Sequence, residues 1–200
     1  MKLEGKVLSG KPIYALLGII GPLIAYLFIG ISIASAPWFR WSKHALSDLG
    51  HALRLESALF YNFGLAAAGL LITIYAVTSL MERAKYAGLC LAASAFSLQL
   101  VAVFDEIYGY VHLLVSEIFF ILLLLSSLTY AIEKRSIIAG FSFIVGLCAW
   151  IFYWMDIYNA GVAVPEILSA TATILWIILS ALEILFKKQS KSPEKEKIQG

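Results

Sequence analysis

Six apolar runs, each of about 20 residues and separated by short polar segments, limit the folds open to this chain. A helix of about 20 apolar residues is long enough to cross the ~30 Å hydrocarbon core of a bilayer. Hydrophobic residues make up 61% of the chain and charged residues 14%, which is not the composition of a soluble domain. We therefore predict an all-α integral membrane protein with six transmembrane helices, at about residues 13–35, 57–80, 86–104, 109–132, 136–155 and 164–186.

The apolar runs and their short connections use nearly the whole chain, so there is no room for a separate soluble domain. We predict one transmembrane domain over residues 1–186 and a disordered cytoplasmic tail over residues 187–200, where the sequence KKQSKSPEKEKIQG is almost free of apolar side chains. The net charge of +2 is too small to indicate nucleic-acid binding. The expected location is the cell membrane, as a multi-pass protein with membrane lipid as its partner.

The distribution of basic residues predicts the orientation. Of the 15 Lys and Arg residues, 12 lie before the first run, in the second and fourth connections, or after the last run. The other three lie in the first connection. Because Lys and Arg concentrate in cytoplasmic segments, we predict that both termini are cytoplasmic and that the first, third and fifth connections face outward.

The first connection holds the longest polar segment between two apolar runs, Trp38–Glu56. If residues 43–55 form a helix with Ser42 as its N-cap, the helix is short and amphipathic. One stripe is then polar (His44, Ser47, Asp48 and His51) and the opposite stripe is apolar (Leu46, Leu49 and Leu53). The polar stripe either lies wet on the membrane surface or turns inward over the helix bundle.

Further polar residues are predicted at the same outer end of the bundle. Glu117 lies within the fourth run, where a carboxylate in lipid is energetically costly unless it is neutral, paired or facing water. Its candidate partners are Asn62 and Gln99. We predict that Asp48, His112 and at least one outer acid converge there. The candidate binding residues are Ser47, Asp48, His51, Asn62, Asp105, Glu106, His112, Glu117 and Glu166.

The same residues include types that could hold a metal or catalyse a reaction. Zinc is one option, with His44, His51 and His112 as the candidate ligands. However, the chain has no HExxH pair, no Cys-x-x-Cys pair and no glycine-rich phosphate loop. For acid and base catalysis the candidates are Asp48, His112 and Ser47, but their spacing matches no known triad.

The run SAPWFRWSKHALSDLG, which follows an apolar first helix containing Gly-Pro, resembles an uncharacterised prokaryotic membrane family, domain of unknown function 998. The likeness includes Phe63 after Asn62, the spacing His112-x-x-x-Ser116-x-x-Phe119, and Gly161-x-Ala163-x-Pro165-Glu166. It implies a six-helix membrane protein and marks Ser47, Asp48, Asn62, His112 and Glu166 as matched positions. The family usually has asparagine where this chain has His44, which argues against a zinc site that depends on His44.

Three classes of function remain open. The first is an outward-facing polar pocket that binds a lipid headgroup, an ion or a small molecule, with transport as an option. The second is an intramembrane hydrolase or transferase that uses acid and base residues or a metal. The third is an accessory subunit of a membrane complex in which the polar cluster only ties the helices together. The absence of a catalytic spacing favours the binding pocket.

Overall fold

A computed structural model describes residues 12–157 and 159–189 of the chain, and within them every regular element is helical. Short turns of other helix types precede α1 at Pro12–Leu16 and continue α2 at Ala76–Leu80. The six long helices are α1 (Leu17–Ala34), α2 (Leu55–Tyr75), α3 (Lys85–Val103), α4 (Tyr110–Lys134), α5 (Ile137–Trp154) and α6 (Ala163–Gln189).

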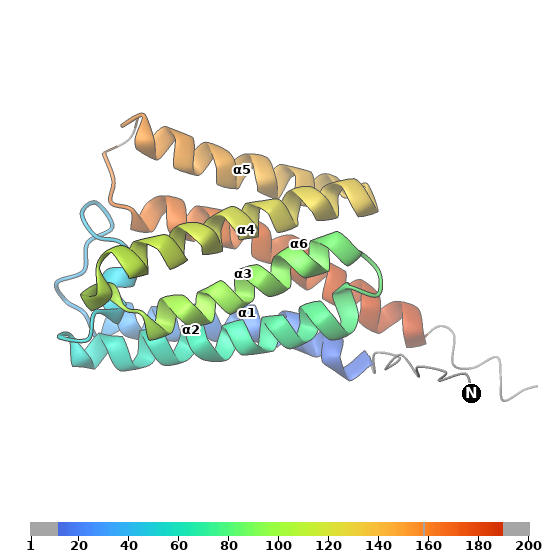
Figure 1. Cartoon of the computed structure of the whole chain (residues 1–200), viewed down its shortest axis with the longest axis horizontal. Coiled ribbons are helices and arrows are strands. Elements are labelled where there is room, and N and C mark those ends of the chain that lie inside the picture. Colours follow the sequence, from blue (N-terminus) through green and yellow to red (C-terminus); the bar gives the residue numbers. More distant parts are fainter. Residues whose placement is uncertain (1–11, 158, 190–200) are drawn as a thin grey trace, which may run out of the picture.

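All six helices are long and apolar enough to span a membrane, which confirms the predicted spans to within a few residues. They run up and down between the two ends of an elongated bundle (Figure 1). The last helix continues to Gln189, so the first three residues of the predicted disordered tail are helical. The remainder of that tail, residues 190–200, lies outside the described residues.

Glycines allow close contacts between neighbouring helices. A Cβ atom at Gly64 would meet the Cβ of Phe28 on α1, and one at Gly69 would lie 2.7 Å from the backbone oxygen of Ala95 on α3. In lipid, where no hydrophobic effect drives helices together, such small residues promote packing because they let backbones approach closely. Glycines of α2 therefore allow this helix to pack closely against both α1 and α3.

The first connection lies against one end of the bundle, beside the third and fifth connections (Figure 1). We refer to this end, which carries Asp48, Asp105, Glu106 and Glu166, as the carboxylate end. The predicted amphipathic helix over residues 43–55 is wrong: before α2 begins at Leu55, only Ser47–Gly50 is helical, as a single 3-10 turn, and Ser42 caps no helix. Two backbone N–H groups of this segment, those of Leu46 and Ala52, are bonded to carboxyl groups of other elements and not to a carbonyl of the same helix.

Candidate functional site

Two carboxylates from distant helices hold the first connection on the bundle. The backbone N–H of Leu46 donates to Oε2 of Glu166, at the start of α6, over 2.6 Å. The N–H of Ala52 donates to Oδ2 of Asp105, just after α3, over 2.8 Å. Glu166 and Asp105 are 8% and 7% exposed. These two hydrogen bonds to buried acids fix the chain on both sides of the 3-10 turn.

The 3-10 turn itself is bonded from three directions. Oδ2 of Asp48 accepts the N–H of Ala45 at 3.1 Å, within the turn. The hydroxyl of Ser47 donates to Oε1 of Glu106 over 3.2 Å, and Nδ2 of Asn62 on α2 donates to the carbonyl of Gly50 over 2.9 Å. A Cβ at position 50 would lie 2.5 Å from Oδ1 of Asn62, so the approach to α2 requires a glycine.

A pair of backbone hydrogen bonds joins the first connection to the segment before α6. The N–H of Gly161 donates to the carbonyl of Trp41 over 2.9 Å, and the N–H of Ala163 donates to that of His44 over 3.0 Å. A Cβ on Gly161 would lie 2.5 Å from the backbone oxygen of His44. The first connection, Trp38–Arg54, is therefore anchored from α2, α6 and the third connection, and we call it the lid.

His112, in the first turn of α4, has a defined proton arrangement. Its Nδ1 lies 2.7 Å from the backbone oxygen of Phe104, which can only accept, so Nδ1 carries the proton. The other ring nitrogen, Nε2, lies 3.4 Å from the hydroxyl of Ser116. His112 is 8% exposed and ties the start of α4 to the end of α3.

The carboxyl of Glu106 binds its proton more tightly than a carboxyl in water does. Burial, the hydrogen bond with Asp48 and the negative charge of Asp48 raise its pKa from 4.5 to about 7, against the opposing effects of the Ser47 hydrogen bond and of Arg54. Two adjacent carboxylates favour sharing one proton because both cannot ionise cheaply at short range. Glu106 therefore titrates near neutral pH.

This shift predicts how stability depends on pH. In the folded chain Glu106 holds a proton up to about pH 7, whereas the unfolded chain releases it near 4.5. The Glu106 contribution to stability is therefore fully present below 4.5 and is lost as pH rises through 7. The test is thermal unfolding in detergent at about pH 5 and at about pH 8, on either side of the folded-state pKa of about 7. The higher pH should lower the melting temperature of the wild-type chain more than it lowers that of Glu106→Gln. Equal slopes would contradict the assignment.

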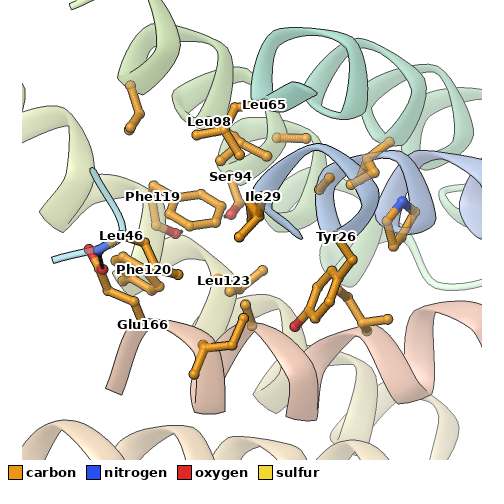
Figure 2. A pocket seen from close by; sticks show the side chains of 18 of the residues that line it. Tyr26, Ile29, Leu46, Leu65, Ser94, Leu98, Phe119, Phe120, Leu123 and Glu166 are labelled. Atoms are coloured by element: carbon orange, nitrogen blue, oxygen red, sulfur yellow. Dashed lines mark hydrogen bonds between the residues drawn. The ribbon is translucent and has the colours of Figure 1, made fainter. Parts of the chain in front are cut away.

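Beneath the lid lies a narrow cavity of about 90 Å³, lined by side chains of every helix except α5. Figure 2 shows Leu46 of the lid and Glu166 together at one side of it, with Phe119 and Phe120 beside them. The lining continues inward along α6 from Glu166 to Ile177, a rise of about 16 Å. Apart from a few hydroxyls and Glu166, the walls are apolar. The cavity thus has one polar end, under the lid, and an apolar interior.

A hydrogen bond closes one side of this cavity. The hydroxyls of Tyr26 on α1 and Thr171 on α6 lie 2.5 Å apart, and Tyr26 lines the cavity (Figure 2). Thr171 is exposed on the outside of α6, which in a bilayer faces lipid. The seam between α1 and α6 is therefore one place where the cavity comes close to the lipid-facing surface.

Some predicted residues lie apart from this arrangement. Glu117 is exposed on the outside of α4 and is not near Asn62 or Gln99, which bond to Gly50 and to Ala95 and Thr73. His44 accepts the N–H of Arg40, and His51 accepts that of Leu53. Among the described residues, no three His, Cys, Asp or Glu side chains form a group that could hold a metal ion.

Two residues near the lid carry no sequence signal that would single them out. Tyr61 on α2 is 6% exposed and lines the cavity beside Glu166. Arg54 places its guanidinium 3.6 Å above the ring of Trp38, with Nη1 buried and without a partner among the described residues. A tyrosine within an apolar run and an arginine at a membrane surface are both ordinary in a sequence. Their role depends on which side chains the fold brings next to them.

Comparison with known proteins agrees with the resemblance seen in the sequence. No curated protein and no solved structure matches the chain. The family model described as "Protein of unknown function (DUF998)" matches residues 19–183. This region begins within α1 and ends within α6, so it contains the lid, all its anchors and the cavity beneath it. The chain therefore belongs to the DUF998 family of proteins of unknown function.

Proposed function

We propose that this protein binds a single-chain amphiphile, with the hydrocarbon chain in the central cavity and the polar head under the lid. The observation that carries the proposal is the shape and chemistry of the cavity: apolar along about 16 Å of α6, with Glu166 at one end. That length is about half of a ~30 Å hydrocarbon core, which is the reach of one lipid chain from its own leaflet.

The volume of the cavity also suits a thin chain. Since about 10–15 Å³ of this space holds one water molecule, a cavity of about 90 Å³ would hold several. Water is disfavoured between apolar walls, whereas hydrocarbon matches them. Ligand sites in proteins are typically apolar pockets with a few convergent polar groups, and Ser47, Ser116 and Glu166 are such groups here.

The polar end of the cavity favours a head that donates hydrogen bonds. Glu166 lines it, and Asp48 and Glu106 lie close enough to interact electrostatically with Glu166. The side-chain oxygens of these acids accept hydrogen bonds, and the negative charge of Asp48, which acts on Glu166, disfavours a second anion beside it. A hydroxyl or ammonium head is therefore expected, and a phosphate or carboxylate head is disfavoured. Most of the binding residues predicted from the sequence therefore serve to hold the lid. In this proposal Glu166 has a second role, because it also contacts the head of the ligand.

The distribution of Lys and Arg predicts cytoplasmic termini, and with that orientation the site lies in the outer leaflet. The seam between Tyr26 and Thr171 then offers a route from the lipid into the cavity without opening the lid. Binding of this kind serves a receptor, a carrier or a subunit that presents a lipid to a partner.

The test is ligand-induced stabilisation of the purified chain in detergent, with 1-oleoylglycerol as the probe. A ligand at about 100 times its Kd stabilises by about 2.7 kcal/mol, which for a chain of this size raises the melting temperature by about 5–10 °C. Ile174→Trp, which fills the cavity, should abolish this rise. The matched control is Leu175→Trp, the neighbouring residue, which is 52% exposed and not in the lining.

Three outcomes would count against the proposal. The first is no stabilisation of the wild-type chain by 1-oleoylglycerol. The second is equal stabilisation of both tryptophan variants, which would place the probe outside the cavity. The third is greater stabilisation by oleoyl phosphate than by 1-oleoylglycerol, which would contradict the predicted preference for a donor head over an anion.

A further inference from the structure

A second cavity, of about 290 Å³, lies at the opposite end of the bundle, where α4 ends and α5 begins. Lys134, which lines the cavity, closes α4 and lies 22 residues after His112, about 33 Å along the helix. None of the residues that line it lines the central cavity. The lining residues are Tyr130, Lys134, Ser136, Ile138, Trp176, Leu179, Ser180 and Glu183.

The inner wall of this cavity is rigid. Nε1 of Trp176 donates to the hydroxyl of Ser127 over 2.9 Å, and the Trp176 ring stacks on Tyr130 at a centroid distance of 4.5 Å. The hydroxyl of Ser180 is 2.6 Å from that of Tyr75. Trp176 and Ser180 are 1% and 4% exposed, so the wall is packed in place before any ligand enters.

The mouth of the cavity opens toward the membrane side of the bundle. Ile138 and Leu179 border it and are 45% and 46% exposed, as side chains on a lipid-facing surface are. Ile138 lies two residues after Ser136, which precedes α5, and Leu179 lies one turn before Glu183, in the last part of the α6 span. Polar residues near the end of a span lie close to the lipid headgroups, so we infer that the mouth is near that depth. A lipid molecule beside the bundle can therefore reach the cavity without leaving its leaflet.

The charges of the cavity define the chemistry that it recognises. Lys134 offers an ammonium group, which binds phosphate as a point charge, and Ser136 offers a hydroxyl group whose oxygen accepts the Ala139 N–H and whose proton can go to a ligand. Glu183 lines the same cavity and favours a cation. We propose that this cavity binds a phosphate ester that also carries an amine, such as the head of phosphatidylethanolamine, with the phosphate at Lys134 and the amine at Glu183.

This inference does not depend on the proposed function. Its test reconstitutes the full chain into phosphatidylcholine bilayers that also hold either phosphatidylethanolamine or phosphatidylglycerol, and counts retained lipids by native mass spectrometry. Wild type should retain phosphatidylethanolamine in preference to phosphatidylglycerol. Lys134→Gln should reduce this retention at least about tenfold, the effect of losing about 1.4 kcal/mol. The control, Lys85→Gln, removes a lysine at the same end that does not line the cavity.

A second variant, Leu179→Trp, fills the mouth from the lipid side and leaves every charge in place. It should also lose phosphatidylethanolamine. Retention equal to wild type in both Lys134→Gln and Leu179→Trp would overturn the proposal, as would equal retention of phosphatidylglycerol by the wild-type chain. The same head could come from the membrane lipid or from a soluble molecule, and glycerophosphoethanolamine added as a competitor distinguishes these two sources. If it displaces the retained lipid, a soluble molecule is a competent ligand. If it does not, the ligand is the membrane lipid.

Discussion

Replacing Gly161 by alanine is expected to release the lid and to destabilise the chain by about 3 kcal/mol, at the upper end of the usual cost of overpacking. The added Cβ would lie 2.5 Å from the oxygen and 2.7 Å from the nitrogen of His44, and 2.8 Å from the carbonyl carbon of Lys43. These are all backbone atoms, so no side chain can turn away to make room. The clash must push apart the two segments that Gly161 joins.

Two measurements check this expectation. Thermal unfolding in detergent should show a melting temperature lower by about 6–12 °C, from 2–4 °C per kcal/mol for a chain of this size. A cysteine at Ser47, which is 8% exposed, should be protected from a water-soluble maleimide in the otherwise wild-type chain and should react readily when Gly161→Ala is added. An unchanged melting temperature together with a protected cysteine would show that the lid does not depend on this contact.

Gly30→Ala is the matched control. A Cβ at Gly30 would meet nothing within 4 Å, and Gly30 lies inside α1. Alanine is favoured over glycine in a helix by about 1 kcal/mol, so this variant should be as stable as wild type or slightly more stable. The contrast between the two positions separates the clash at Gly161 from any general effect of losing a glycine.

The spans and the lid differ in how far the sequence predicts them, and the reason is physical. A span is determined locally, because a backbone in lipid must satisfy its own hydrogen bonds and about 20 apolar residues are enough to form the helix. The lid is determined by residues far away in sequence: Leu46 bonds to Glu166 across 120 positions, and Ala52 bonds to Asp105 across 53. The spacing of polar residues within residues 43–55 gives no information about these distant partners.

The candidate site shows the same division. The orientation predicts that Asp105, Glu106 and Glu166 lie at the same end as the first connection, and Asp105 and Glu166 are indeed buried there and bonded to it. A different argument, the cost of a carboxylate within an apolar run, selects Glu117, which the structure leaves exposed on α4. The cavity was not predicted, since its walls are apolar residues that look like any other part of a span. A void between helices depends on side-chain packing, which periodicity does not encode.

Substitutions at Glu166 separate its hydrogen bond from its charge, and the alanine variant is expected to have the second large effect. Glu166→Ala removes the acceptor for the Leu46 N–H. Leaving a buried donor without a partner costs about 1–3 kcal/mol, which corresponds to a drop in melting temperature of about 2–12 °C. The Ser47→Cys labelling assay should report a loosened lid in this variant too.

Glu166→Gln should behave differently, because the amide oxygen of glutamine still accepts a hydrogen bond from Leu46 while the side chain carries no charge. We therefore expect a melting temperature close to wild type and a protected cysteine at position 47. If Glu166→Gln falls as far as Glu166→Ala, the negative charge and not the hydrogen bond holds the lid. If Glu166→Gln keeps the lid closed but loses the response to 1-oleoylglycerol, Glu166 has a separate role as the group that meets the ligand head.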